Sequence, residues 1–362
     1  MQITSAIQKN DKTRNEKYIS RCIELGKNGL GSTFPNPSVG CVIVHHEKII
    51  GEGFTSPYGG AHAEVNAIAS VPNKALLKEA TIYVTLEPCS HHGKTPPCAD
   101  LIIKHAIPHV VIGILDPHEK VAGKGIQKLK NVGCNVTVGV LEKECREHHK
   151  RFLTYHQKKR PYIILKWAET LDGFMAPEEH RRSEKPTPYW ITNERSRQLV
   201  HQWRSVEQAI LVGTQTVIKD NPKLNVRAWH GTSQVRIVLD RTLKIGPDHF
   251  VLDKNEKTIV LTEVTDTKNY VRGIMYELID FSDNVIQQIC DILYKHHMVS
   301  LIVEGGAKTL ETFLAMDVWD EARVFIGDTN FESGLKAPSL PTDKLVDSKH
   351  INNDILNFYI ND

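Results

Sequence analysis

The sequence of 362 residues has no long hydrophobic run, no strong excess of one charge, no internal repeat and no low-complexity tract. Its apolar runs, such as VVIGIL at 110–115, are far too short to cross a bilayer, so we expect no membrane partner. The polar stretch MQITSAIQKNDKTRNEK at 1–17 lacks the continuous apolar core of a secretory signal. The sequence therefore predicts a cytoplasmic protein.

The charge is nearly balanced, because 45 Lys and Arg side chains face 43 Asp and Glu side chains and leave a net charge of +2. A protein that holds a phosphate backbone usually carries a basic field, so this balance argues against a nucleic-acid partner. The content of 40% hydrophobic and 24% charged residues is ordinary for a globular protein.

The length exceeds what one hydrophobic core usually organises, which predicts two domains. The clearest break in mid-chain is the basic cluster KKR followed by proline at 158–161. We therefore predict a first domain over 1–156, a linker over 157–160 and a second domain over 161–362.

Two of the seven cysteines lie in one short segment, TLEPCSHHGKTPPC at 85–98. A disulfide, a structural metal site and a catalytic metal site are the three alternatives. In the cytoplasm cysteines stay reduced, so close cysteines are more often metal ligands or catalytic groups than a disulfide. The other five are expected to be small packed side chains: Cys22, Cys41, Cys134, Cys145 and Cys290.

Strand-like and helix-like patterns alternate in the first half, which predicts an α/β domain with a sheet sandwiched between helices. The expected strands are 39–44, 48–54, 81–88, 109–117 and 134–140. The expected helices are 16–26, 62–70, 98–106 and 123–133. In this arrangement His62 begins one helix, and Cys89 leaves a strand towards a second helix near Cys98. Two helix N-termini are then expected to meet at one point.

A metal at that point would have His62, Cys89 and Cys98 as ligands, and one imidazole with two thiolates suits a catalytic zinc ion whose fourth position is open. Glu64, two residues after His62, could exchange protons with substrate without ligating the metal. H-x-E followed by P-C and a second cysteine is a signature of zinc-dependent deaminases. Here eight residues, rather than two, separate the cysteines.

One family has this longer spacing. HAEV at 62–65 with TLEPCSHHGKTPPC resembles the deaminase part of the RibD family, bifunctional enzymes of riboflavin biosynthesis in which a pyrimidine deaminase is fused to a pyrimidine reductase. The resemblance continues, in the family's order and over most of the chain, through PNPSVGCVIV, DPHEKVAGKGI, LKWAETLDG, ILVGTQTV, DNPKLNVR and VEGG. It implies a cytidine-deaminase-like three-layer zinc domain followed by a dihydrofolate-reductase-like domain.

The resemblance also implies substrate contacts in the first domain. Asn36 is expected to face the pyrimidine, where its amide can donate and accept hydrogen bonds, and Lys94 is expected to contact the substrate. His91 or His92 could complete a structural zinc site instead, but such a site would leave Glu64 without a task. The remaining histidine pairs are expected to be solvated: His45 and His46, His148 and His149, and His296 and His297.

The second half again alternates strands with helices. The expected strands are 161–168, 207–213, 235–240, 258–262 and 300–306, and the expected helices are 196–205, 283–297 and 307–316. GTQTV at 213–217 and EGGAKTL at 304–310 place small or hydroxylic residues at strand-to-helix junctions, where free backbone N–H groups bind phosphate. Neither is a G-x-G-x-x-G motif. An α/β domain that binds no nucleotide would therefore explain these patterns equally well.

The resemblance implies that this half is an NADPH-dependent reductase. It implies cofactor-binding positions at Ala168, Trp190, Thr216, Asp220, Gly306, Ala307, Lys308, Thr309, Leu310, Glu311 and Thr312. It implies substrate-binding positions at Arg204, Leu224, Arg227 and Glu304. Two arginines could clamp a ribose phosphate, and Glu304 could accept hydrogen bonds from ring or ribose donors.

The family's reactions imply zinc-dependent deamination of 2,5-diamino-6-ribosylamino-4(3H)-pyrimidinone 5′-phosphate. NADPH-dependent reduction of 5-amino-6-(5-phosphoribosylamino)uracil to the ribitylamino product follows. The implied partners are therefore small phosphorylated pyrimidines, with one zinc ion per chain. Relatives associate through the reductase domain, which implies a homo-oligomer. Asp220 is also a hypothetical acid near the site of hydride transfer.

The chain departs from the family at Pro188, where relatives usually have a serine two residues before Trp190, and the preceding segment at 176–188 is longer than usual. An inactive reductase half is therefore one alternative. Two others are a deaminase of nucleosides or nucleic-acid bases with an unrelated second domain, and a non-enzymatic module stabilised by zinc. Neither of these last two explains DNPKLNVR or VEGG.

Overall fold

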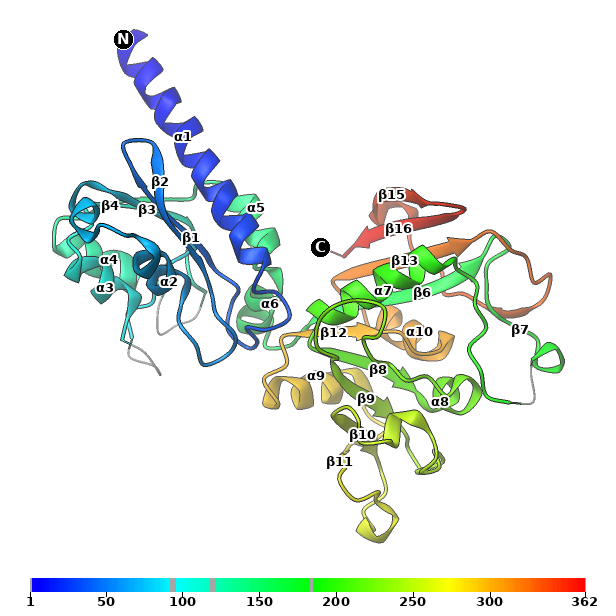
Figure 1. The fold of residues 1–362 in the computed structure, drawn as a ribbon. Coiled ribbons are helices and arrows are strands. Elements are labelled where there is room, and N and C mark those ends of the chain that lie inside the picture. Colours follow the sequence, from blue (N-terminus) through cyan, green and yellow to red (C-terminus); the bar gives the residue numbers. More distant parts are fainter. Residues whose placement is uncertain (1, 92–95, 118–121, 183–184, 362) are drawn as a thin grey trace. The chain divides into compact units, whose positions relative to one another are not determined.

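The computed structural model describes residues 2–91, 96–117, 122–182 and 185–361. The chain folds as two compact units, Met1–Lys158 and Lys159–Asp362, and the division falls within the segment 157–160. Among the described residues, no helix is both long and apolar enough to cross a membrane. Each unit is a sheet covered by helices (Figure 1), so the predicted two-domain α/β fold class is confirmed.

The first unit contains a five-stranded sheet in the order β2-β1-β3-β4-β5. Its strands are β1 Gly40–His45, β2 Lys48–Phe54, β3 Thr81–Leu86, β4 His109–Ile114 and β5 Asn135–Val138. Its helices are α1 Gln2–Lys27, α2 Ala63–Ser70, η1 Lys74–Glu79, α3 Cys98–Lys104, α4 Lys124–Asn131, α5 Glu142–His148 and α6 Lys150–Lys158. β1 pairs with β2 and β3 in antiparallel fashion, whereas β3, β4 and β5 are parallel.

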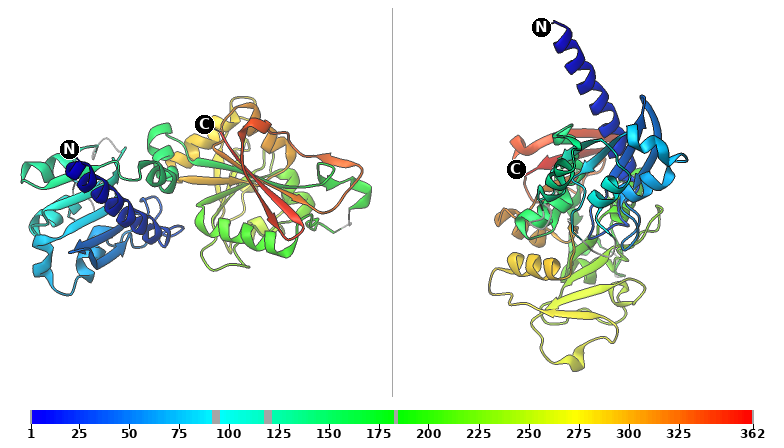
Figure 2. Two further views of the ribbon diagram at one scale, coloured as in Figure 1. Left: turned by 90° about the horizontal axis from the view of Figure 1, so that it is seen from above. Right: turned by 90° about the vertical axis from the view of Figure 1, so that its left-hand side faces the viewer.

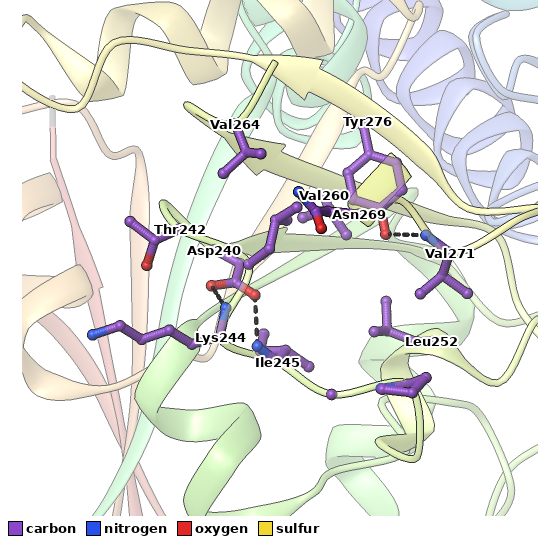
Figure 3. A pocket seen from close by; sticks show the side chains of 13 residues that line it. Asp240, Thr242, Lys244, Ile245, Leu252, Val260, Val264, Asn269, Val271 and Tyr276 are labelled. Atoms are coloured by element: carbon purple, nitrogen blue, oxygen red, sulfur yellow. Dashed lines mark hydrogen bonds between the residues drawn. The ribbon is translucent and has the colours of Figure 1, made fainter. Parts of the chain in front are cut away.

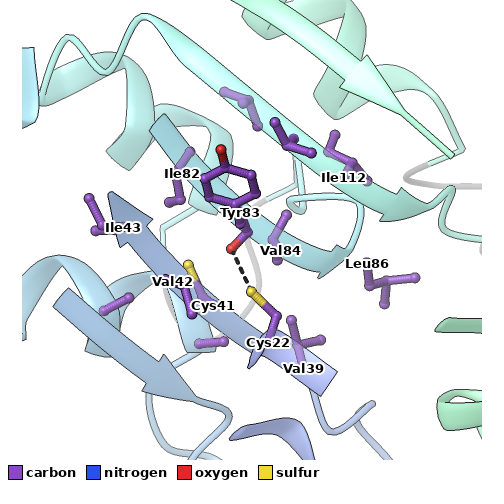
Figure 4. Packing of buried hydrophobic residues seen from close by; sticks show 14 of the residues in the cluster. Cys22, Val39, Cys41, Val42, Ile43, Ile82, Tyr83, Val84, Leu86 and Ile112 are labelled. Atoms are coloured by element: carbon purple, nitrogen blue, oxygen red, sulfur yellow. Dashed lines mark hydrogen bonds between the residues drawn. The ribbon is translucent and has the colours of Figure 1, made fainter. Parts of the chain in front are cut away.

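The central strands of this sheet are buried along most of their length, because helices cover both faces. Helices α1 and α5 pack against each other and against the sheet, and α2 packs against β1, β2 and α3. Helix α1 begins earlier than the expected 16–26, since polar residues can be helical without showing an apolar periodicity. Figure 4 shows Cys22 and Cys41 packed among the apolar side chains of this core.

The cysteine prediction is confirmed for Cys22, Cys41, Cys145 and Cys290, which are buried, but Cys134 is only partly buried and lies just before β5. The prediction of solvated histidines fails for His45, His148 and His296, which are partly buried, and most clearly for His149. This side chain is 2% exposed, and its Nε2 lies 2.9 Å from Thr85 Oγ1. Burial holds the pKa of His149 well below its usual range, so the imidazole is a neutral part of the core.

The second unit contains a nine-stranded sheet in the order β11-β10-β9-β8-β12-β6-β13-β16-β15. Its strands are β6 Tyr162–Thr170, β8 Ala209–Gly213, β9 Val235–Leu239, β10 Thr258–Thr262, β11 Met275–Leu278, β12 Ser300–Val303, β13 Glu321–Gly327, β15 Leu345–Ile351 and β16 Asp354–Ile360. A separate two-stranded sheet joins β7 Phe174–Pro177 and β14 Gly334–Lys336. The short 3-10 helices are η2 Glu179–Arg181, η3 Phe250–Leu252, η4 Thr267–Asn269 and η5 Thr342–Lys344.

The helices of this unit lie on both faces of the large sheet (Figure 2). They are α7 Glu194–Val206, α8 Thr214–Asp220, α9 Val285–Lys295 and α10 Ala307–Ala315. α9 and α10 pack on one face, and α7 and α8 pack on the other. Seven strands from β11 to β13 are parallel, so their carboxyl ends meet along one edge of the sheet. The antiparallel strands β15 and β16, which complete the sheet beyond β13, were not predicted from the sequence.

Candidate active sites

The three predicted zinc ligands of the first unit converge. His62 is the N-cap of α2, Cys98 is the first residue of α3, and Cys89 follows β3. His62 Nδ1 lies 3.3 Å from Cys98 Sγ and 3.7 Å from Cys89 Sγ. The ligand atoms of all three residues lie within 4.8 Å of one another. Two helix N-termini therefore meet at one point, as the alternation of elements predicts.

The spacing of these atoms fits a tetrahedral zinc ion. Zn–S and Zn–N bonds of about 2.3 and 2.0 Å at tetrahedral angles place sulfur and nitrogen about 3.5 Å apart. The two sulfur-to-nitrogen distances bracket that value. One imidazole and two thiols are also the donor set that zinc prefers. The residues present therefore fit the ion.

The site favours ionisation of a thiol. A hydrogen bond from Cys98, helped by His62, lowers the pKa of Cys89 to about 4, although burial opposes the shift. The backbone N–H of Cys98 also donates to Cys89 Sγ at 3.3 Å. The hydrogen bond with Cys89 raises the pKa of His62. A positive helix N-terminus and hydrogen-bond donors thus prepare Cys89 to act as a thiolate.

Glu64 lies in the first turn of α2 and is 4% exposed. Burial, followed by the nearby charge of Cys89, raises its pKa to about 7. A carboxyl group whose pKa is close to the working pH can both accept and return a proton. The carboxyl group is therefore suited to proton transfer beside the three candidate ligands.

Glu87 also supports this site, although no sequence motif predicts it. Its buried carboxylate accepts hydrogen bonds from the backbone N–H groups of Gly123 at 2.9 Å, Gly125 at 3.0 Å and Ile126 at 3.3 Å. These donors surround the beginning of α4. Glu87 therefore ties that helix to the segment that carries Cys89.

In the second unit, the two junctions predicted to bind phosphate lie together. β8 and β12 are parallel neighbours, and α8 and α10 begin at their carboxyl ends. A Cβ atom on Gly305 would lie 2.4 Å from Val212 Cα, so only glycine allows this approach of the two backbones. Gly306 has a φ of 42° and would place a Cβ atom 3.2 Å from Thr216 Oγ1. The helix N-termini of GTQTV and EGGAKTL thus lie beside each other.

A buried ion-pair cluster lies next to this edge. Arg204 donates to both carboxylate oxygens of Glu304, at 3.0 and 2.7 Å, and Lys166 Nζ lies 3.6 Å from Glu304 Oε2. Burial alone would raise the pKa of Glu304, but the charges of Arg204 and Lys166 outweigh it and lower the pKa to about 2. Lys166 was not predicted, because a lone lysine in a strand carries no signal of its partner.

Comparisons with known proteins cover both units. Residues 12–114 match the family model "Cytidine and deoxycytidylate deaminase zinc-binding region", and residues 161–333 match the model "RibD C-terminal domain". The riboflavin biosynthesis protein RibD of Aquifex aeolicus is 40% identical over 329 residues, which cover 90% of each chain. The chain belongs to the RibD family. RibD of Actinobacillus pleuropneumoniae is 41% identical over 298 residues, covering 80% of this chain and 77% of that protein.

Solved structures agree with this assignment. The structure of a diaminohydroxyphosphoribosylaminopyrimidine deaminase/5-amino-6-(5-phosphoribosylamino)uracil reductase from Thermotoga maritima has a TM-score of 0.88 and 39% identity, covering 97% of this chain and 100% of that one. RibD of Acinetobacter baumannii has a TM-score of 0.87 and 32% identity, covering 96% and 99%. This chain is accordingly a bifunctional riboflavin-biosynthesis enzyme, with a zinc-binding deaminase domain and an NADPH-dependent reductase domain.

The remaining positions that RibD resemblance implies in the deaminase unit are Asn36 and Lys94. Asn36 is partly exposed, in a turn where its backbone N–H donates to Thr33 O at 3.0 Å. Lys94 lies outside the described residues, as does His92. His91 is described and exposed.

The implied RibD cofactor positions outside the two junctions vary in their surroundings. Ala168 lies partly buried on β6. Trp190 is 55% exposed, and the guanidinium of Arg197 lies 4.9 Å from its ring centre. Asp220 ends α8 and forms an ion pair with Arg182, which belongs to the longer segment before Trp190. Burial raises the pKa of Asp220 even though Arg182 opposes the shift.

Two of the implied RibD substrate positions are arginines whose charges interact, Arg204 and Arg227. Arg204 is engaged with Glu304, and its charge, after burial, lowers the pKa of Arg227. His201, one turn before Arg204, is 5% exposed, and burial followed by the charge of Arg204 lowers its pKa to about 4. The side chain of Leu224 is packed in the core at 3% exposure, so a substrate contact at this position falls to its backbone.

A cavity of ≈ 460 Å³ lies beside β9, β10 and β11, where no sequence motif indicates one (Figure 3). Its walls combine apolar side chains such as Leu252 and Val260 with polar ones such as Thr242 and Asn269. The buried carboxylate of Asp240 accepts 2.9 Å hydrogen bonds from the N–H groups of Lys244 and Ile245, which fixes the loop that forms one side. The cavity therefore has a preformed wall after the carboxyl end of β9.

Proposed function

We propose that His62, Cys89 and Cys98 hold the zinc ion of the deaminase unit and that Glu64 is its catalytic residue. The observation that carries this proposal is the convergence of the three ligand atoms within 4.8 Å. When bound, zinc supplies the Lewis-acid chemistry that hydrolytic deamination uses. Glu64 takes the two protons of the attacking water in turn and passes one to the ring nitrogen and one to the departing amine, a role that its pKa of about 7 supports.

The substrate that we assign to this unit is 2,5-diamino-6-ribosylamino-4(3H)-pyrimidinone 5′-phosphate. The Thermotoga maritima relative is named for this deamination and for the reduction that follows it. Asn36 and Lys94 are proposed as substrate contacts. A purely structural zinc site is less well supported, because it gives no reason for a buried Glu64 beside the ligands.

Removal of zinc tests the separation of the two activities. Dialysis against a strong chelator should abolish ammonia release from the diaminopyrimidine ribotide, because deamination loses its Lewis acid. NADPH oxidation with the deaminated uracil compound as substrate should stay unchanged, since the reductase unit contains neither candidate cysteine. Zinc added back should restore ammonia release. Loss of both activities at equal rates during dialysis would contradict separate sites.

For the reductase unit, we propose that NADPH binds across the junctions of β8 with α8 and of β12 with α10. The proposed contacts are Ala168, Trp190, Thr216, Asp220 and the run from Gly306 to Thr312. Backbone N–H groups at the beginning of α10 and the close approach of Gly305 to β8 support a diphosphate at this position. When bound, NADPH supplies the hydride that reduces C1′ of the ribose in 5-amino-6-(5-phosphoribosylamino)uracil.

The cavity beside β9 supports a place for the adenosine end of the cofactor. Ligands of open parallel sheets bind outside the carboxyl ends of the strands, and the loop 240–247 that follows β9 forms one wall of this cavity. Its neighbour β8 ends at Gly213, and Thr214 Oγ1 donates to Leu239 O at the end of β9. The proposed diphosphate and adenosine positions are therefore on adjacent strands.

The ion-pair cluster of Arg204, Lys166 and Glu304 is proposed to hold the phosphoribosyl group together with Arg227, whose charge interacts with those of Arg204 and Glu304. Lys166, Arg204 and Arg227 carry three positive charges, Glu304 carries one negative charge, and the low pKa of His201 keeps that imidazole neutral. Three minus one leaves two positive charges, which matches a phosphate dianion. Leu224 contributes through its backbone.

Gly305→Ala tests the proposed cofactor junction. The added Cβ would overlap Val212 Cα at 2.4 Å and Gly213 N at 2.6 Å, so β12 and β8 must separate. Such overpacking costs about 1–3 kcal/mol, and we expect part of that cost to appear as a roughly 5- to 100-fold higher KM for NADPH. Steady-state kinetics of NADPH oxidation measure this, with ammonia release as the internal control. An unchanged KM would count against a diphosphate at this junction.

We propose that the protein works in the cytoplasm. The reductase unit is also proposed to mediate self-association. β15 is an edge strand of the large sheet, and Leu345 and Val346 on it are 41% and 61% exposed. Unpaired backbone groups beside exposed apolar side chains support pairing with a second copy.

A further inference from the structure

A second group of metal-binding side chains lies at the far end of β1. His45 ends this strand, His46 begins the turn to β2, and Glu79 ends η1. Their ligand atoms lie within 4.8 Å of one another. Neither the deaminase chemistry nor the reductase chemistry uses any of these residues.

The backbone fixes this arrangement. β1 and β3 are antiparallel, with Val44 opposite Thr81, so the next residues along each strand bring His45 and His46 towards Ala80 and Glu79. His46 and Glu47 have φ values of 45° and 61°, which form a tight turn between β1 and β2. The end of β1 and the end of η1 thus place the three residues near one another, with the side chains of His46 and Glu79 exposed.

The side chain of His45 is mostly buried, and one of its ring nitrogens lacks a hydrogen-bond partner among the described residues. The side chain is 16% exposed, and this nitrogen is its buried Nε2 atom. Glu79 Oε2 lies 3.6 Å from this nitrogen, which exceeds hydrogen-bond length. The ring of His46 stands edge-on to that of His45, with 4.1 Å between the ring centres. A buried polar atom without a partner is costly, so the site favours an additional partner.

A metal ion would give His45 Nε2 the partner that it lacks in the described part of the chain. Two ligands about 2.0–2.1 Å from a tetrahedral ion lie about 3.4 Å apart, close to the separation of His45 Nε2 and Glu79 Oε2. Two imidazoles and one carboxylate suit zinc and similar divalent transition metals, and they leave room for water. We propose that His45, His46 and Glu79 form a second metal site, for zinc or a related divalent ion.

This second site is separate from the proposed catalytic one. Cys89 follows the carboxyl end of β3, whereas Glu79 precedes its amino end. The six residues of β3 place about 15–20 Å between the two sites at strand spacing. Metal binding here joins the β1–β2 turn to the start of β3. It thereby stabilises the end of the sheet opposite the catalytic centre.

The test is the zinc content of the full chain. The metal-free protein is dialysed against buffered free zinc, and bound zinc is measured by mass spectrometry. Wild type should hold two zinc ions per chain, whereas His46→Gln and Glu79→Gln should each hold one, with the rate of ammonia release unchanged. His109→Gln, which alters an exposed histidine at the start of β4, is the matched control and should still hold two.

Substitution of cobalt for zinc shows which of the two proposed sites holds the metal. Cobalt bound by Cys89 and Cys98 shows sulfur-to-metal charge-transfer absorption, whereas cobalt bound by imidazole and carboxylate does not. The second equivalent of cobalt should therefore add no charge-transfer absorption, and His46→Gln should remove that equivalent alone. Wild type with one thiolate-bound ion would overturn this site and leave the proposed deaminase centre intact. Absence of the charge-transfer band would instead contradict the deaminase centre.

Discussion

Glu64→Gln is expected to lower the rate of ammonia release on the order of 10²- to 10⁴-fold, the usual contribution of a general acid–base group. The amide keeps the size of the side chain but cannot accept and return protons. Zinc content should stay at the wild-type value, because Glu64 is not among the three candidate ligands. NADPH oxidation with the deaminated substrate should also stay unchanged, since Glu64 belongs to the other unit.

Glu142→Gln provides the matched control. Glu142 lies on α5 in the same unit, with a side chain 53% exposed, and its ion pair with Arg146 is on the surface. This variant should release ammonia at the wild-type rate. If Glu64→Gln did the same, the proton-transfer role would have to be abandoned. If it lost zinc as well as activity, Glu64 would instead help to hold the metal.

Glu304→Gln is expected to lower the free energy of unfolding of the reductase unit by about 3–5 kcal/mol, because it leaves Arg204 and Lys166 buried without their counter-charge. Reduction should be lost as well, since these side chains form the proposed phosphoribosyl site. Denaturant unfolding of the full chain measures the first effect, and NADPH oxidation measures the second. Ammonia release by the folded protein should not change.

The same pair predicts a pH dependence. The pKa of Glu304 is about 2, below the ordinary value of 4.5, so its contribution to stability is complete above pH 4.5 and is lost as the pH falls towards 2. Glu304→Gln should therefore flatten the loss of stability between these values. Asp347→Asn is the control, because Asp347 pairs with Lys349 on the surface and such pairs contribute about 0–1 kcal/mol. Equal effects of the two variants would show that the Glu304 pair contributes no more to stability than a surface pair.

The chemistry of the deaminase centre could be predicted from the sequence because its groups lie in two short motifs. His62 and Glu64 share H-x-E, and Cys89 and Cys98 share one segment between a strand and a helix. The alternation of strand and helix then requires these motifs to meet at one edge of the sheet. Local patterns thus determined which residues carry this chemistry, and the family resemblance specified the reaction.

The surroundings of these groups could not be predicted in the same way. The hydrogen bonds that the start of α4 donates to Glu87 connect residues that are 36, 38 and 39 positions apart in the sequence. Likewise, nothing near His149 in the sequence shows that it is buried against Thr85. In the sequence, such polar side chains cannot be distinguished from surface residues, and only the packing shows that they are buried.

The contacts of the reductase site could be predicted from the sequence even less than those of the deaminase centre. Arg204 and Glu304 are 100 residues apart and meet because α7, which carries Arg204, packs over β6 and β12, and Glu304 follows β12. The strand order of the large sheet places the cavity beside β9, and the pairing of β1 with β3 brings Glu79 to His45. The sequence by itself determined the α/β fold class and the zinc-binding motif, since these depend on local periodicity and spacing, and its motifs carried the resemblance to the family. Which charges face one another, and which are buried, was decided by strand order and register, because pair distances and desolvation arise only when distant segments pack together.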